Sequence, residues 1–175
     1  MEIPSPIDTS DLSLEELKIV SEKAEKALDG CMARNEVLEN RLEVLYKQLY
    51  GINIVGLFSA VTAAATKLNI SMMLIISAGV FLSGTIIAAT IALLGIIVQQ
   101  PFPGSAWSDF ENYRDVYDKS EAGLLRYSID VCLYKIQIMV MVCEHKTKYF
   151  VYSLWTLITA IFLSLSAGAS AFIFS

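Results

Sequence analysis

The sequence predicts an all-α integral membrane protein with three transmembrane helices and a cytoplasmic helical bundle or coiled coil. Of its 175 residues, 55% are hydrophobic and only 18% are charged, which is too apolar for an ordinary soluble domain. No charged residue lies between Lys47 and Lys67, between Lys67 and Asp109, or after Lys148. Each of these windows is long enough for the roughly 20 helical residues that cross a bilayer core of about 30 Å.

The charge-free windows divide the chain into four segments. We expect a cytoplasmic N-terminal heptad helix, a transmembrane hairpin of two spans, a second cytoplasmic helical segment and a third transmembrane helix. Their expected bounds are residues 1–50, 51–98, 99–148 and 149–175. Within the hairpin, Lys67, Asn69 and Ser71 supply a polar turn between the spans.

The distribution of basic residues predicts the orientation. Six Lys and Arg residues precede the first span, six lie between the second and third, and only Lys67 lies on the opposite side. Because Lys and Arg are retained in the cytoplasm, the N-terminus is expected inside and the C-terminus outside the cell's inner membrane. The cytoplasmic portion then holds twelve basic and eighteen acidic residues, and this net charge of −6 argues against nucleic-acid binding.

The first segment carries a helix start followed by a heptad seam. Ser13 and Glu16 have the spacing of a capping box, in which both side chains satisfy backbone N–H groups at the start of a helix. The seam positions that we assign to self-association are Leu28, Asn35, Leu38, Leu42, Leu45 and Leu49. Asn35 occupies an a position, where a buried amide fixes the register between partners. We favour a homo-oligomer; the alternative is that this seam packs within its own chain.

A second apolar stripe lies in residues 99–148 and supports that alternative. Its members are Phe110, Tyr113, Tyr117, Leu124, Tyr127, Val131, Tyr134, Ile138 and Met141. A further S-x-x-E start at Ser108 follows the breaker-rich turn PFPGS at 101–105. A single upright helix over 108–148 would be about 60 Å long, which a connector of about 30 Å cannot accommodate. The segment therefore lies flat on the bilayer or folds back near residues 120–123; we favour the hairpin, because Gly123 can end a helix.

Groups that carry enzyme chemistry are sparse, so we expect no catalytic, cofactor or metal site and no enzyme activity. His145 is the single histidine, and we interpret it as an interfacial side chain. The cysteines Cys31, Cys132 and Cys143 are odd in number, lack metal-binding spacing and are expected to be packing thiols. The nucleotide-binding, zinc-protease and serine-hydrolase motifs are absent.

Two sets of residues are the remaining candidates for functional sites. Small and polar residues in the spans are suited to close helix packing or to lining a pore built from several copies; they are Asn53, Gly56, Gly79, Ser83, Thr85, Ser164 and Gly168. Basic residues in the cytoplasmic segments are the only supply for an anionic ligand, with salt bridges as the alternative use; they are Arg34, Arg41, Arg114, Arg126 and Lys135.

The layout resembles the transmembrane effectors of bacterial anti-phage signalling, chiefly Pycsar transmembrane effectors and more loosely SLATT-type effectors. A membrane hairpin ends at Pro101, and the sequence of residues 124–150 leads through Lys148 and Tyr149 directly into the last span. In place of the acidic-x-Lys-Ala element of Pycsar effectors, this chain has Gln-Leu-Tyr-Gly at 48–51. The resemblance implies a protein that is quiet until a cyclic nucleotide or a partner sensor triggers it, and that then assembles and breaches the inner membrane. The alternative is a membrane-anchored scaffold whose acidic bundle docks a soluble enzyme or sensor.

Overall fold

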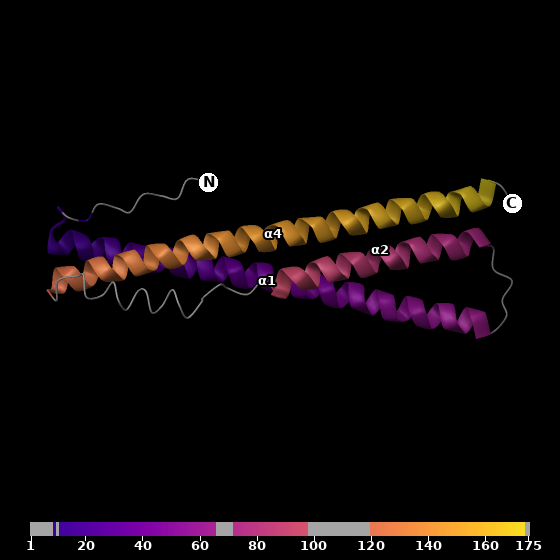
Figure 1. Cartoon of the computed structure of the whole chain (residues 1–175), viewed down its shortest axis with the longest axis horizontal. Coiled ribbons are helices and arrows are strands. Elements are labelled where there is room, and N and C mark those ends of the chain that lie inside the picture. The colour runs from indigo at the N-terminus through magenta and orange to yellow at the C-terminus, as the bar shows by residue number, and fades with distance from the viewer. Residues whose placement is uncertain (1–8, 10, 66–71, 98–119, 174–175) are drawn as a thin grey trace. The chain divides into compact units, whose positions relative to one another are not determined.

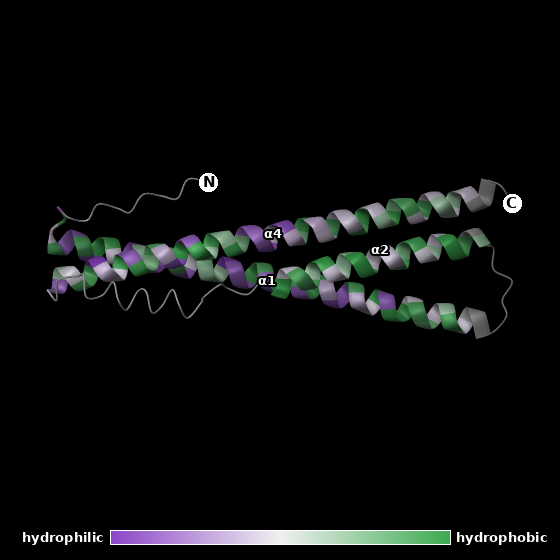
Figure 2. Cartoon of the chain, viewed as in Figure 1, coloured by the Kyte–Doolittle hydropathy of each residue, from purple (hydrophilic) through white to green (hydrophobic). Residues whose placement is uncertain are grey.

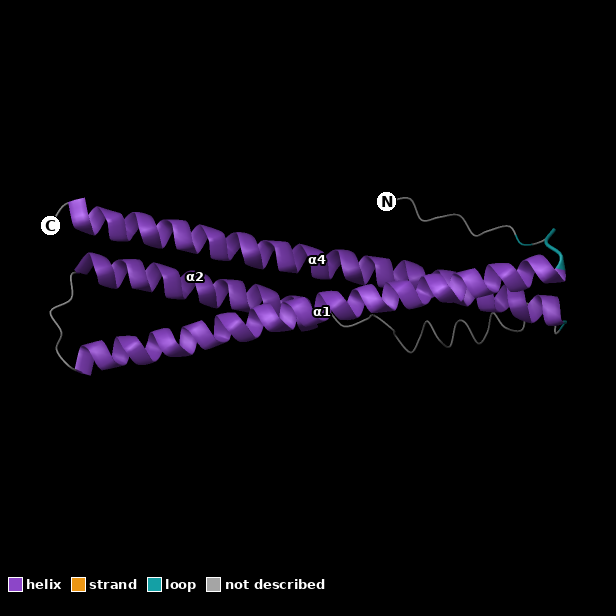
Figure 3. Ribbon diagram, turned by 180° about the vertical axis from the view of Figure 1, so that it is seen from behind, coloured by secondary structure: helices purple, strands orange, loops and turns teal. Residues whose placement is uncertain are grey.

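The computed structural model describes residues 9, 11–65, 72–97 and 120–173. These residues form three α-helices (Figure 1), which are α1 (Leu14–Ala65), α2 (Met72–Ile97) and α4 (Glu121–Ile173). No strand occurs in this part of the chain (Figure 3). The predicted all-α class is therefore confirmed. The expected turn between the first two spans lies outside the described residues.

All three helices contain a stretch that is long and apolar enough to cross a membrane. These stretches fall within Leu14–Thr62, Leu74–Ile97 and Glu121–Ser170. Figure 2 shows that α2 carries almost no hydrophilic residue, whereas hydrophilic residues are frequent in the N-terminal parts of α1 and α4. By length and composition the described chain thus has three candidate membrane spans.

The capping box predicted at the start of α1 is present. The Ser13 backbone N–H donates to Glu16 Oε2 over 2.9 Å, and the Ser13 hydroxyl lies 2.7 Å from the same oxygen. In return, the Glu16 N–H donates to Ser13 Oγ over 3.4 Å. Helix α1 begins at the next residue, Leu14, because Ser13 and Glu16 satisfy backbone donors that a helix start would otherwise leave free.

Both α1 and α4 continue without interruption from a charged into an uncharged sequence. Helix α1 is unbroken through residues 49–53, and α4 is unbroken through 147–151. Neither stretch contains proline, which would remove a backbone donor and clash with the preceding turn. Gly51 is tolerated inside α1, at the cost of about 1 kcal/mol that a helical glycine carries relative to alanine.

Helix α4 begins where the sequence suggested a fold-back. Ser120 is not helical, and its Oγ accepts a hydrogen bond from the Gly123 N–H over 3.1 Å, as an N-cap serine does. The prediction that no single helix spans 108–148 is therefore confirmed. The role assigned to Gly123 was wrong, because it lies buried in the first turn of α4 instead of ending a helix. The expected first arm, with Phe110, Tyr113, Tyr117 and the turn at 101–105, lies outside the described residues.

The chain divides into two compact units, and the first comprises residues 1–37 and 99–144. In this unit α1 and α4 run parallel, because Lys18 Nζ pairs with Glu121 Oε1 at 2.8 Å near both starts, and Cys132 lies beside Glu25 and Asp29 further along. Burial and the charge of Glu25 raise the pKa of the Cys132 thiol above its usual value, which keeps this side chain neutral. The thiol is therefore suited to packing.

The stripe of α4 that is buried in the first unit overlaps only in part with the predicted one. Its buried members are Ile129, Cys132, Ile138, Met139, Val142 and Cys143. Of the predicted members, Ile138 is buried and Tyr127 and Val131 are partly buried, whereas Leu124, Tyr134 and Met141 are exposed. The helix therefore carries two overlapping apolar stripes, and the buried one is selected by the contact with α1. On α1 the seam member Asn35 is buried, and the buried residues Leu17, Ser21 and Ala24 continue the same heptad spacing toward the N-terminus.

The second unit comprises residues 38–98 and 145–175, and α2 packs between parts of α1 and α4. Asn53 contacts Thr85 of α2, while Ser77 and Ala88 of α2 contact Ser164 and Ser153 of α4. These pairings make α2 antiparallel to both neighbours, so α1 and α4 are parallel here. The buried core contains Leu49, Ala88 and Ala89, with Leu45, Tyr46 and Leu157 packed against it.

The capping box makes the start of α1 sensitive to acid. Hydrogen bonds from the Ser13 side chain and then its backbone lower the pKa of Glu16 below the usual value. A carboxyl group whose pKa is lowered by folding stabilises the fold above its unfolded pKa, and this contribution is lost as pH falls through the folded pKa. We expect the first turn of α1 to fray only at a pH below the range in which an unperturbed glutamate titrates, because the pKa of Glu16 is lowered. Hydrogen exchange of its amides and an NMR titration of Glu16 measure this.

Ser13→Ala is the matched control for the capping box. Without the serine hydroxyl, the pKa of Glu16 should move up toward the usual range, and the first turn should exchange faster at neutral pH. An identical Glu16 titration in the two proteins would contradict the assignment.

Candidate functional site

Small residues bring α2 into close contact with its neighbours in the second unit. A Cβ atom added at Gly84 would overlap Ala160 of α4, and one added at Gly56 of α1 would overlap the side chain of Leu82. At Gly95 it would lie 2.8 Å from Tyr149 Cβ. Such positions let helix backbones approach closely where both surfaces are apolar and packing drives association.

Hydroxyl and amide groups form bridges across the same interfaces. Thr85 Oγ1 lies 2.7 Å from Asn53 Oδ1 and 2.9 Å from the Leu82 carbonyl, so two acceptors share one hydrogen. Ser153 is fully buried and donates to the Ala88 carbonyl over 2.8 Å. Ser77 Oγ donates to the Ser164 carbonyl over 2.7 Å. These bonds satisfy polar groups that would otherwise be costly among apolar side chains.

Beyond residue 56, α1 leaves the neighbourhood of α2. The side chains from Leu57 to Thr62 are exposed, and Figure 1 shows the C-terminal end of α1 diverging from the N-terminal end of α2. Ser59 and Thr62 donate to carbonyl oxygens four residues earlier in α1, over 2.8 and 2.9 Å. Their hydroxyl hydrogens are therefore already used within the helix.

One face of α2 points away from the other helices of the unit. Gly79 and Ser83 are exposed one turn apart, and a Cβ added at Gly79 would meet nothing within 4 Å. The Ser83 hydroxyl donates a hydrogen bond within α2, to the Val80 carbonyl over 3.0 Å. The four-residue spacing of Gly79 and Ser83 is that of a helix-packing motif. Among the described residues, no other helix packs against these two positions.

An ion pair between a buried lysine and a half-exposed glutamate joins α1 and α4 near the end of their charged sequences. Lys146 Nζ lies 2.9 Å from Glu39 Oε2, and the lysine side chain is 3% exposed whereas the glutamate is 49% exposed. The burial of this lysine was not predicted from the sequence. Its spacing from Met139, Val142 and Ser153 would have placed it on the buried stripe of α4.

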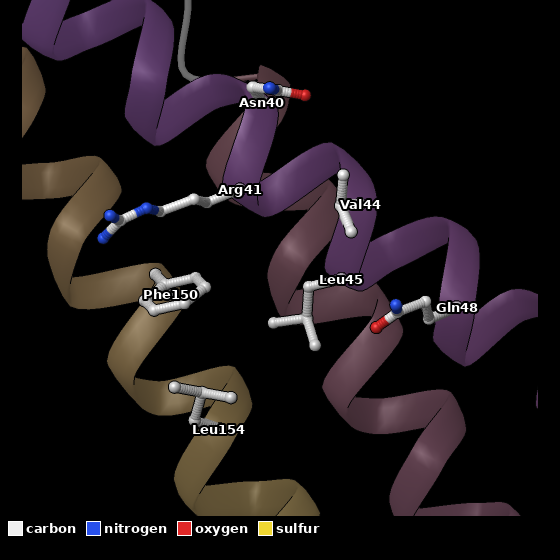
Figure 4. A pocket seen from close by; sticks show the side chains of 7 residues that line it. All are labelled: Asn40, Arg41, Val44, Leu45, Gln48, Phe150 and Leu154. Carbon is white, nitrogen blue, oxygen red and sulfur yellow. The ribbon is translucent and has the colours of Figure 1, made fainter.

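Next to this ion pair, α1 and α4 form an open groove of about 290 Å³. Figure 4 shows its lining side chains, which are Asn40, Arg41, Val44, Leu45 and Gln48 of α1 with Phe150 and Leu154 of α4. The Arg41 guanidinium extends from α1 toward α4, while Leu45, Phe150 and Leu154 cover the apolar part of the groove. From the sequence, Arg41 was a candidate contact for an anionic ligand, but the groove that it lines was not predicted.

The residues assigned to the oligomer seam lie largely against their own chain. Asn35, Leu42 and Leu49 are buried, and Leu28, Leu38 and Leu45 are partly buried. The Oδ1 atom of Asn35 has no hydrogen-bond partner among the described residues. The geometry thus leaves little of this seam accessible to a second copy.

The other candidates fall into two groups. Asn53, Gly56, Thr85 and Ser164 contact neighbouring helices of the same chain, and Gly168 lies close to Ser77, whereas Gly79 and Ser83 face outward. Among the basic candidates, Arg34 and Arg41 are exposed and Arg126 and Lys135 are partly buried. Only Arg41 of these lines the groove, and Arg114 lies outside the described residues.

The described residues present packing surfaces between helices and one open groove. Within the described ranges, no group of three His, Cys, Asp or Glu residues is placed to hold a metal ion. Comparison with protein-family models, curated proteins and solved structures finds no match to this chain. The function must therefore be argued from the residues and their contacts.

Two glycines of α2 should differ sharply in their response to substitution. Gly84→Leu places a side chain against Ala160, so we expect it to destabilise the unit by about 1–3 kcal/mol, as overpacking does. Gly79→Leu adds the same side chain in open space and should leave stability nearly unchanged. Unfolding of both variants in mixed detergent micelles measures the difference. Equal losses would contradict the contact between α2 and α4.

Breaking the ion pair between Glu39 and Lys146 should lower the free energy of unfolding more than breaking an exposed ion pair does. Glu39→Gln leaves Lys146 buried without its partner, and we expect a loss of about 2 kcal/mol, below the ~3–5 of a fully buried pair because Glu39 is half exposed. Glu43→Gln is the control, since it breaks the exposed pair with Lys47 and should cost about 0.3–0.5 kcal/mol. Adding Lys146→Met to Glu39→Gln should recover stability. Equal losses in the two single variants would argue against a buried lysine.

Proposed function

We propose that this chain is a membrane-integral effector that oligomerises and permeabilises the cytoplasmic membrane when a signal arrives, in anti-phage defence. The signal is a cyclic nucleotide or a partner sensor. The observation that carries the proposal is the continuity of α1 and α4 through residues 49–53 and 147–151. A helix without a break transmits a rotation or tilt from its charged part to its apolar part, because no flexible joint absorbs the motion.

In this proposal the apolar parts of α1, α2 and α4 cross the inner membrane. The N-terminal segment and the residues between α2 and Lys148 face the cytoplasm, because these segments hold most of the Lys and Arg residues and such residues are enriched on the cytoplasmic side. The C-terminus lies outside. The exposed aromatic residues Tyr152 and Trp155, just beyond the last lysine, suit the boundary between headgroups and hydrocarbon.

Permeabilisation requires several copies. Three spans are too few to surround an aqueous path, and the hydroxyl groups of Ser77, Thr85 and Ser153 already bond within the chain. The outward face of α2 supplies a surface for assembly, because Gly79 and Ser83 allow another helix backbone to approach. The exposed end of α1, which diverges from α2, is a second apolar surface free to contact neighbouring copies.

Dye release from vesicles tests the proposal directly. The purified full chain, reconstituted into dye-loaded phospholipid vesicles, should hold the dye alone and release it when the activating cyclic mono- or dinucleotide is added. Cyclic mono- and dinucleotides are added one at a time, and the corresponding linear nucleotides serve as controls. Vesicles that remain tight throughout while the protein binds a soluble partner in fixed stoichiometry would contradict the effector role.

The outward face of α2 gives a sharper test of assembly. Gly79→Leu should reduce dye release and oligomer size several-fold, because a bulky side chain prevents close approach of helices. Ile86→Leu is a matched control, since it preserves side-chain volume on an exposed position of the same helix. Oligomer size is measured by crosslinking in the vesicles. Unchanged release in Gly79→Leu would place the assembly surface elsewhere.

A membrane-anchored scaffold is the second candidate function. The favouring observation is the exposed acidic surface on the first part of α1, where Glu15, Glu22, Glu25, Asp29 and Glu36 all face solvent. Such a surface would dock a soluble enzyme or sensor with a basic patch. A salt-sensitive complex with tight vesicles would favour this function over permeabilisation.

A further inference from the structure

The groove between α1 and α4 lies at the level where charged sequence gives way to apolar sequence. In the second unit the two helices are parallel, and Glu39 lies opposite Lys146. By this register Arg41 of α1 lies level with Lys148 of α4. These are among the last cations before the uncharged stretches of both helices, and the apolar lining begins one turn further along.

The electrostatics of the groove favour an anion. The two carboxylates of α1 next to Arg41 are already engaged, since Glu39 pairs with Lys146 and Glu43 pairs with Lys47 at 2.6 Å. Arg41 and Lys148 are exposed, and neither forms an ion pair with any residue that the structure describes. Arg41, which lines the groove, therefore has no ion-pair partner in the described chain, and Lys148 adds a second positive charge at the same level of α4.

The remaining lining is apolar and suits a hydrocarbon chain. Leu45, Phe150 and Leu154 lie along the groove beyond Arg41, as Figure 4 shows. The volume of about 290 Å³ is open on one side, so it accommodates part of a molecule whose remainder lies outside. A ligand with an anionic head at one end and an acyl chain at the other matches both halves.

We propose that this groove binds one anionic phospholipid of the cytoplasmic leaflet. Its phosphate accepts hydrogen bonds from the Arg41 guanidinium, which is suited to bidentate contact with phosphate, and Lys148 contributes its charge. One acyl chain lies along Leu45, Phe150 and Leu154. The lipid thereby bridges α1 and α4 beside the ion pair of Glu39 with Lys146. This inference rests on the proposed crossing of the membrane, but not on permeabilisation.

Native mass spectrometry of the full chain in detergent tests the site. Phosphatidylglycerol is titrated against wild type and Arg41→Gln, with phosphatidylcholine as the zwitterionic comparison. Wild type should retain one phosphatidylglycerol more tightly than phosphatidylcholine, and Arg41→Gln should weaken the phosphatidylglycerol complex about tenfold, the effect of losing one charge-assisted contact. Arg34→Gln removes an exposed arginine of the same helix outside the groove and should change affinity less than twofold.

A second variant tests the acyl-chain part without changing charge. Val44 is exposed at the groove wall, so Val44→Trp should fill the groove and weaken phosphatidylglycerol binding without unfolding the protein. Equal weakening by Arg41→Gln and Arg34→Gln would overturn the proposal, as would equal affinity for the two lipids. Displacement of the lipid by millimolar glycerol phosphate would show a headgroup-only anion site and overturn it too.

Failure of this site and failure of the proposed function are distinguishable. Resistance of the chain to alkaline carbonate extraction from membranes reports the crossing itself, and dye release reports permeabilisation. A chain that remains in the membrane and binds no phosphatidylglycerol at Arg41 would overturn the lipid site alone.

Discussion

Close approach of α2 to its two neighbours is the constraint on which the second unit depends. Helix α2 has no charged residue and gains little from hydrophobic exclusion when its surroundings are as apolar as itself. Its position is instead determined by packing, with Gly84 against Ala160 and Gly56 against Leu82. The hydrogen bonds of Thr85, Ser153 and Ser77 are possible only because the backbones are this close.

The two units differ in whether their buried polar groups have hydrogen-bond or ion-pair partners. In the second, the buried hydroxyl groups of Thr85 and Ser153 have acceptors, and the buried ammonium of Lys146 has a carboxylate. In the first, Asn35 is buried while its Oδ1 has no partner among the described residues, which carries a desolvation cost. An amide retained at such a cost suggests a role in selecting the register between α1 and α4, as polar residues do in coiled coils.

The proposed effector and the proposed lipid site draw on different surfaces. Assembly would use the outward face of α2, whereas the lipid would lie between α1 and α4. A bridging phospholipid would hold these two helices together at the membrane surface, which is where motion from the charged parts would enter the bilayer. The composition of the membrane would then set how readily the helices separate.

The sequence by itself determined where helices begin and which stretches are apolar, because these depend on local groups. Ser13 and Glu16 are three residues apart and cap α1 whatever surrounds them, and the charge-free windows are a property of composition. The tertiary structure alone decided which stripe of α4 is buried, since heptad spacing allows overlapping stripes and only the register with α1 selects Ile129 and Cys132 over Leu124 and Tyr134. The burial of Lys146 and the groove at Arg41 also follow from that register, because each combines residues that are distant in sequence.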